Sequence, residues 1–194
     1  TGSLAKNKRS TNYASKECGA KVLGSNPEAE NVKHILTSNR DEYMINPCKA
    51  SKKWFVIELC EPVHISHFEV ATYELFSSQP KTFKISLSDR YPTKEWTNIG
   101  EFTATEERIP QTFEVKEGYV VQFVKVEMID HYGTEHFCPL TSFKSFGVPV
   151  EYDEYGHRQH EGSDEDNDND MDEILLRNGD TNEESDTHKN LFET

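Results

Sequence analysis

Residues 82–88 read Thr-Phe-Lys-Ile-Ser-Leu-Ser, and this regular alternation of apolar and polar side chains decides the fold class. Successive side chains of a strand point to opposite faces, so Phe83, Ile85 and Leu87 are expected on a buried face, with Lys84 and Ser86 pointing outward. Earlier in the chain, residues 54–59 (Trp-Phe-Val-Ile-Glu-Leu) have the β-branched and aromatic content of a second strand.

Further strand patterns lie on both sides of these two segments. Pro62 is expected to end the strand at 54–59, and residues 63–70 form the next one, with Val63 and Ile65 and, after a phase change, Phe68 and Val70 turned inward. A turn at 89–92 follows the strand at 82–88, and the remaining strands are predicted at 96–102, 111–115, 120–128 and 142–148. Only residues 28–36 have helical spacing, with Ala29, Val32 and Ile35 on one side. Many short strands with one short helix predict an all-β fold, an antiparallel β-sandwich rather than an α/β fold.

Charge divides the chain into a domain and a tail. The net charge is −14, and residues 151–194 contain 16 acids and three bases, which leaves residues 1–150 close to neutral. We therefore expect a linker at 1–11, a globular domain at 12–150 and a disordered acidic tail at 151–194, because the tail has few large apolar residues to bury. The acidic run at 163–173 resembles the start of a calcium loop, but Asn169 stands at the sixth position, where such a loop needs glycine. We expect no metal or other cofactor there.

The composition also limits the classes of partner. The acidic balance disfavours nucleic acid. No run approaches the ~18 apolar residues of a membrane-spanning helix, and the first residues lack the apolar core of a signal peptide. Any membrane anchor is therefore expected in sequence outside this chain.

Four cysteines, Cys18, Cys48, Cys60 and Cys138, lie within the expected domain. They have no Cys-x-x-Cys or Cys/His spacing of the usual zinc type, so a structural metal site is not expected. An even count fits two disulfides in an oxidising compartment or four reduced thiols in the cytosol, and spacing alone does not choose among the three possible pairings.

Catalysis is not expected from this sequence. His136 beside Cys138 invites comparison with a Cys/His nucleophile, but Cys138 precedes a proline in a buried-looking strand, and a disulfide would remove the thiolate. His64 and His67 are three residues apart on an expected strand, so they are predicted to face opposite sides and to share no metal.

Loops at one end of a sandwich can instead hold a ligand. Aromatic faces and hydroxyls suit sugars and chain termini, and the candidate ligand-binding residues in the expected loops are Tyr73, Phe76, Ser77, Ser78, Tyr132 and His136. Packing at the rim of the sandwich is the alternative role for Tyr73 and Phe76. A carbohydrate- or peptide-binding module is therefore one hypothesis.

Several separated motifs, taken in their order, resemble the SUN domain. They are Trp54–Leu59, Tyr73–Phe83, Ser88–Pro92, Val124–Glu127, Gly133–Leu140 and Phe146-Gly147, and they cover about residues 12–150. The chain is more similar to the SUN-like branch that includes osteopotentia. The resemblance implies a galactose-binding-like jelly-roll sandwich, and it implies the pairing of Cys48 with Cys138, which leaves Cys18 with Cys60.

Function depends on the branch of the family. Nuclear-envelope SUN domains bind KASH peptides, and their pocket uses a serine, matched here by Ser78, and two tyrosines, at whose positions His136 and Leu140 stand. Leucine cannot donate to a carboxylate, the segment between Val22 and Trp54 is shorter than in that branch, and the potassium-binding loop is altered at 46–48. The osteopotentia-like branch instead implies a luminal domain of an endoplasmic-reticulum membrane protein. Such a domain would bind a membrane partner and secretory clients and support their folding. The nuclear envelope is the alternative location.

Overall fold

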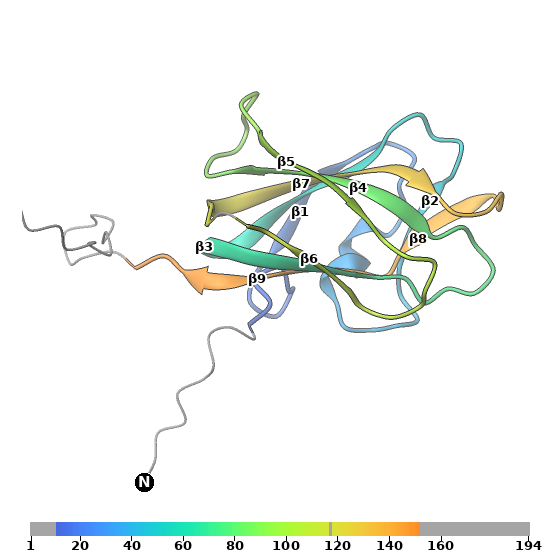
Figure 1. Ribbon diagram of the computed structural model, residues 1–194, viewed down its shortest axis with the longest axis horizontal. Coiled ribbons are helices and arrows are strands. Elements are labelled where there is room, and N and C mark those ends of the chain that lie inside the picture. Colours follow the sequence, from blue (N-terminus) through green and yellow to red (C-terminus); the bar gives the residue numbers. More distant parts are fainter. Residues whose placement is uncertain (1–10, 117, 152–194) are drawn as a thin grey trace, which may run out of the picture. The chain divides into compact units, whose positions relative to one another are not determined.

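The computed structural model describes residues 11–116 and 118–151, which form a β-sandwich (Figure 1). All but the first residue of the predicted tail at 151–194 and all but the last residue of the predicted linker at 1–11 lie outside the described residues. The elements, in chain order, are β1 (Lys21–Ser25), the 3-10 helix η2 (Val32–Leu36), β2 (Met44–Pro47), β3 (Lys53–Ala71), β4 (Pro80–Ser88), β5 (Thr97–Thr103), β6 (Gln111–Glu114), β7 (Val120–His131), β8 (Phe137–Leu140) and β9 (Ser142–Pro149).

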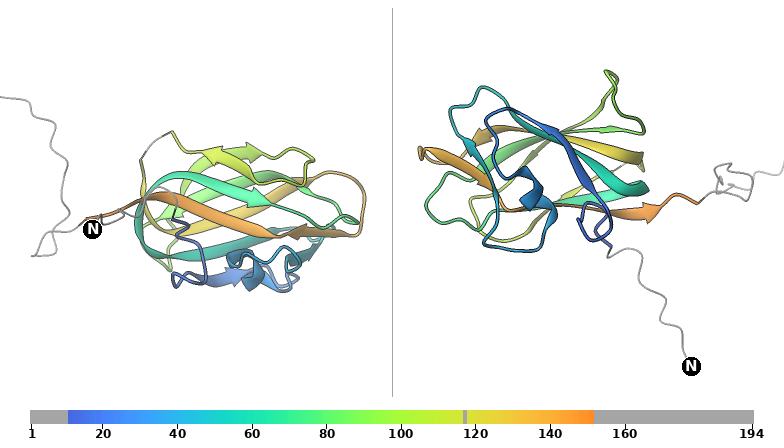
Figure 2. Two further views of the ribbon diagram at one scale, coloured as in Figure 1. Left: turned by 90° about the horizontal axis from the view of Figure 1, so that it is seen from below. Right: turned by 180° about the vertical axis from the view of Figure 1, so that it is seen from behind.

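The strands pair in antiparallel fashion throughout. One layer has the order β1-β3-β7-β4-β5, and β6 and β9 both pair with β3, while β2 and β8 form a separate two-stranded sheet. In Figures 1 and 2, β4, β5 and β7 lie on one side of the sandwich, and β6 and β9 lie on the other. This arrangement confirms the all-β sandwich that the alternating pattern predicted.

A single 19-residue strand, β3, serves both layers. Its first part pairs with β1 and β7, and its second part pairs with β9 and β6. The expectation that Pro62 ends the strand is therefore wrong. Proline has no N–H to donate, but Pro62 lies where the β3–β7 register shifts between Glu58 and Val63, so no ladder bond is lost there. The irregularity carries the chain from one layer to the other.

A second irregularity in β3 produces the predicted change of phase. The β3–β9 register shifts between Ile65 and His67. Val63, Ile65, Phe68 and Val70 are accordingly all buried. The same shift puts His64 and His67 on one outward side, opposite Val148 and Phe146 of β9, so the prediction that they face opposite sides is wrong.

The core lies between the layers and is rich in aromatic rings. Phe143 of β9 contacts Phe55 and Phe68, with ring centroids 5.6 and 5.4 Å apart. Phe83, Ile85 and Leu87 of β4 are buried, as their alternation predicted. Ser86 is also buried, because β4 lies between β5 and β7 and its outward face is covered by side chains such as Trp96 and Lys125.

The helix predicted at 28–36 is shorter than expected. Only Val32–Leu36 is helical, as a 3-10 turn, because Asn31 adopts a left-handed conformation (φ 57°) that ends any continuous helix before it. Ile35 and Leu36 are buried, while Ala29 and Val32 are half-buried. In the part of the chain that the structure describes, no helix has the length and apolar content needed to cross a membrane.

Two disulfides join Cys18 to Cys60 and Cys48 to Cys138, which are the pairs that the resemblance implies. The first ties the segment before β1 to β3, and the second ties the end of β2 to β8. Each closes a long loop, of 42 and 90 residues, so each restricts the unfolded chain strongly.

Candidate functional site

Three loops meet at the end of the sandwich where β2 and β8 lie (Figure 1). They are residues 72–79 after β3, residues 132–136 between β7 and β8, and residues 48–52 between β2 and β3. Backbone bonds join them: the Ser78 N–H donates to Phe137 O (2.9 Å), the Tyr132 N–H to Gln79 O (2.9 Å), and the Cys48 N–H to His136 O (2.9 Å). The three loops therefore form one continuous surface.

The loop after β3 displays two apolar side chains. Phe76 is 86% exposed and Leu75 is 64% exposed. Their backbone is held in place from both sides, because the Glu74 carboxylate accepts the Phe76 N–H and the Ser77 hydroxyl, and the Arg108 guanidinium donates to the carbonyls of Glu74 and Leu75 (3.1 Å each). The loop therefore presents two exposed apolar side chains on a backbone that other side chains hold in place.

The two tyrosines among the predicted site residues have structural partners. The Tyr132 hydroxyl donates to Ala104 O (2.7 Å), and the Lys81 ammonium lies 5.3 Å from the centroid of its ring. The Tyr73 ring lies under the Arg40 guanidinium, 4.6 Å from its centroid. Both tyrosines therefore help to fix the loops, and Arg40, Lys81 and Arg108 are site residues that sequence reasoning missed.

Ser78 is buried, with 2% of its surface exposed. Its hydroxyl accepts the Glu135 N–H (3.0 Å), and its backbone N–H donates to Phe137 O. Gly133, with φ +73°, lies against this hydroxyl, since a Cβ there would be 3.2 Å from Ser78 Oγ. Ser78 thus joins the loop after β3 to the loop before β8.

An open groove of about 440 Å³ lies beside these loops, and its lining residues are Cys48, Lys49, His131, Gly133, Thr134, Glu135 and His136. His136 is exposed and packs edge-on against Phe137, which is 48% exposed. Of the predicted ligand-binding residues, the structure therefore brings His136 to this groove. It leaves Phe76 and Ser77 on the adjoining loop, and Ser78 beneath both.

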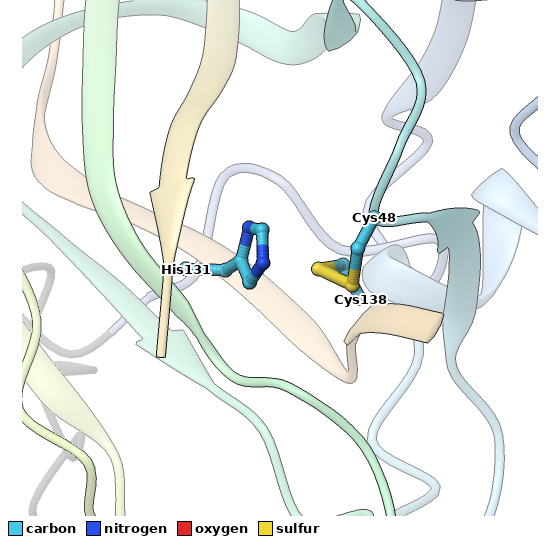
Figure 3. Close-up of side chains that lie close together, drawn as sticks. All are labelled: Cys48, His131 and Cys138. Carbon is cyan, nitrogen blue, oxygen red and sulfur yellow. A yellow bond between two sulfur atoms is a disulfide. The ribbon is translucent and has the colours of Figure 1, made fainter. Parts of the chain in front are cut away.

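Cys48, His131 and Cys138 come close together at the groove (Figure 3). One ring nitrogen of His131 and the two sulfur atoms all lie within 4.8 Å of one another, a separation that would suit metal ligands. The sulfur atoms are bonded to each other, however, so they offer no thiolates to a metal ion.

Lys53 has an unusual position for a lysine, because it is only 6% exposed. Its ammonium group donates to the carbonyls of Cys48 (3.1 Å) and Ala50 (3.0 Å), so the loop between β2 and β3 wraps around a positive charge of the chain itself. The sequence pattern gave no signal for this, since three consecutive polar residues before a strand usually face water.

A model of the Sad1/UNC-like C-terminal (SUN) domain matches residues 25–149. The chain belongs to the SUN domain family. Its sequence is 48% identical over 162 residues to the human SUN domain-containing ossification factor, and 37% identical over 137 residues to SUN domain-containing protein 5 of Arabidopsis thaliana. These matches cover 79% and 71% of this chain, but the chain spans only 13% and 24% of the length of these two relatives.

Solved structures with the same fold include carbohydrate-binding modules, a domain of a chitobiase and allantoicase. The family 32 CBM of Clostridium perfringens NanJ in complex with galactose has a TM-score of 0.53 at 11% identity, covering 66% of this chain and 91% of that one. The C-terminal domain of a chitobiase from Bacteroides fragilis has a TM-score of 0.56 at 18% identity, covering 68% and 95%. These likenesses establish the galactose-binding-like jelly-roll fold. The family match identifies the chain as a SUN-like domain.

The SUN-domain positions that the resemblance singled out have unequal surroundings. His136 is exposed at the groove, whereas Leu140 is completely buried and pairs with Met44 of β2. A buried leucine packs within the sandwich and offers no hydrogen bond to a peptide carboxylate.

Proposed function

We propose that this SUN-like domain is the luminal interaction module of an endoplasmic-reticulum membrane protein, and that it supports the folding or stability of secretory and membrane proteins by binding them. The 48% identity to the human ossification factor supports the branch, and the two disulfides fit an oxidising compartment. The observation that carries the proposal is the pair of exposed side chains Leu75 and Phe76 on a loop that Arg108 braces.

Bracing matters for binding. A partner that contacts Phe76 buries a large aromatic surface, and the loop loses little freedom because its backbone is already fixed. Phe137 adds a further apolar side chain to the loops that meet here. The surface is therefore expected to bind an apolar segment of a polypeptide, such as an incompletely folded client.

KASH binding at the nuclear envelope is the first alternative. The buried Leu140 argues against it, because the pocket expected at that position would lack a donor. Carbohydrate binding is the second alternative, and the jelly-roll fold favours it, since one solved structure of that fold is a complex with galactose.

The test uses the full-length protein, produced in the endoplasmic reticulum of cultured cells. Leu75→Ser and Phe76→Ser are combined in one variant, and Val148→Thr serves as the matched control, because Val148 is a 46% exposed apolar residue on β9, outside the three loops. Copurified membrane and secretory proteins are quantified by mass spectrometry, and the domain alone is tested against KASH-tail peptides and a glycan panel.

We expect the double variant to lose most of the copurified reticulum proteins, while the control retains them. Equal recovery with both variants would contradict the role of the 75–76 surface. Saturable binding of a KASH peptide would move the protein to the nuclear envelope, and saturable binding of one glycan would favour the carbohydrate-binding alternative.

A further inference from the structure

The Cys48–Cys138 disulfide is open to the groove on one side only. Cys48 lines the groove and is half-buried, whereas Cys138 is 3% exposed. A thiolate that enters the groove therefore meets Cys48 and not Cys138. Thiol–disulfide exchange depends on which sulfur is attacked and on how well the other sulfur leaves.

Charged groups of both signs surround this disulfide. Lys49, His131 and His136 line the groove, and the Lys53 ammonium lies 3.1 Å from the carbonyl oxygen of Cys48. Against these basic groups stand the Glu135 carboxylate in the groove lining and Asp130, whose carboxylate accepts the backbone N–H of His131. Reactive cysteine sites are typically partly exposed, as Cys48 is.

The other disulfide provides the contrast within the same chain. Cys18 is exposed and Cys60 is half-buried, so Cys18–Cys60 is the more accessible of the two. Its sequence neighbours are the exposed acids Glu17 and Glu61 and the exposed base Lys16, so the acids outnumber the bases there. Among the described residues, no histidine forms a close cluster with both sulfur atoms of Cys18–Cys60. A ring nitrogen of His131, in contrast, lies within 4.8 Å of both sulfur atoms of Cys48–Cys138.

We propose that Cys48–Cys138 is a thiol-exchange site that captures an accessible thiol of a partner polypeptide as a mixed disulfide. The partner's thiolate attacks Cys48 Sγ, a new bond forms between these two sulfur atoms, and the Cys48–Cys138 bond breaks. The electron pair of that bond goes to Cys138 Sγ, which takes a proton relayed from water through His131, whose ring nitrogen lies within 4.8 Å of both sulfur atoms. The partner thiol is oxidised to the mixed disulfide and Cys138 is reduced to a thiol.

In the reverse step Cys138 returns its proton through His131 to water, its thiolate attacks Cys48 Sγ, and the partner sulfur leaves as a thiolate, which restores the domain disulfide. Capture is therefore reversible and needs no oxidant besides the disulfide itself. The site goes beyond the proposed binding function, because it requires neither the Leu75–Phe76 surface nor a location in the endoplasmic reticulum.

The experiment uses the whole 194-residue chain without added metal and with a chelator present. The chain is exposed to reduced glutathione or to a cysteine-containing peptide with apolar flanking residues, and the reaction is stopped by acid. Alkylation and peptide mapping then give the rate at each disulfide separately. Cys18–Cys60 is the internal reference in every sample.

We expect Cys48–Cys138 to react at least about tenfold faster than Cys18–Cys60, with the added thiol found on Cys48. His131→Asn should slow the first reaction by about tenfold or more and leave the second unchanged. His64→Asn, which alters an exposed histidine on β3, is the matched control and should change neither rate. Circular dichroism before the reaction verifies that both variants are folded.

Accessibility alone predicts that Cys18–Cys60 reacts faster than Cys48–Cys138. Faster reaction at Cys18–Cys60 would therefore overturn the proposal. Equal rates for His131→Asn and wild type would overturn the role of His131 as proton donor. Faster capture of the peptide than of glutathione supports a polypeptide partner, whereas capture of glutathione alone would overturn that part of the inference.

Discussion

Replacing Lys53 by methionine tests whether the loop that carries Cys48 is organised by a buried positive charge. The ammonium group is the donor in two hydrogen bonds, to the carbonyls of Cys48 and Ala50, and the side chain is 6% exposed. Methionine keeps the length and the apolar stem of lysine, so the substitution removes mainly the charge and the two donated bonds.

The expected loss of stability follows from these contacts. Each hydrogen bond from a charged donor contributes about 1.5–3 kcal/mol, and part of this is offset because methionine avoids the cost of burying an ammonium group. The net loss in the free energy of unfolding should be about 2 kcal/mol, which corresponds to a fall in Tm of roughly 5–10 °C. Lys52→Met, at the exposed neighbouring position, should change stability by less than about 0.5 kcal/mol.

Urea unfolding measures the global effect, and amide hydrogen exchange measures the local one. The Cys48 N–H donates to His136 O and the Ala50 N–H donates to Pro47 O, so both amides should exchange faster in Lys53→Met. Stability and protection equal to those of wild type would refute the reasoning, since water would then be satisfying the two carbonyls as well as lysine does.

Two further substitutions test contacts between β3 and the segments beside it. Gly147→Ala should destabilise the domain by about 3 kcal/mol in urea unfolding, because the added Cβ would overlap the carbonyl oxygen of His64 on the paired strand; an unchanged midpoint would contradict this close approach. Asn26→Ala should cost about 2–3 kcal/mol at neutral pH, because it leaves the Trp54 N–H without its buried acceptor. Asn26 also donates to the Glu28 carboxylate, and this bond holds the pKa of that carboxyl below its ordinary value. The wild-type chain therefore loses this stabilisation as pH falls below about 4.5, and the difference in unfolding free energy between Asn26→Ala and wild type should become smaller there. A difference that stays constant down to pH 3 would contradict the linkage.

The strands that alternate cleanly could be predicted from the sequence, and the interrupted ones could not. Residues 82–88 lie in β4 with their apolar face buried, because alternation determines which side chains face the core. Pro62 was misleading, since its effect depends on whether the ladder needs an N–H at that point, and the register shift in β3 removes the need. Short strands such as β1, with a glycine inside it, carry too few periodic residues to be recognised.

The site was predicted only in part because its braces come from distant segments. Arg108 reaches the carbonyls of Glu74 and Leu75 across more than 30 residues, and Asn26 joins the end of β1 to Trp54 and Asn46. A hydrogen bond between a side chain and a remote backbone carbonyl leaves no periodic trace in the sequence. Aromatic and hydroxyl residues in loops therefore indicated the region, but not which of them support the loop and which face a partner.

The division between buried polar supports and exposed apolar side chains explains how this end of the sandwich can bind a partner. The groups that would be costly to bury alone, Ser78 and the Lys53 ammonium, are placed beneath the loops, where they satisfy backbone atoms of neighbouring segments. The apolar groups that gain most from being covered, Leu75 and Phe76, are left outside. Because the backbone is fixed before a partner arrives, the free energy from covering these side chains is not spent on ordering the loop. Weakening a brace such as Arg108 should therefore reduce partner affinity even though Arg108 itself need not contact the partner.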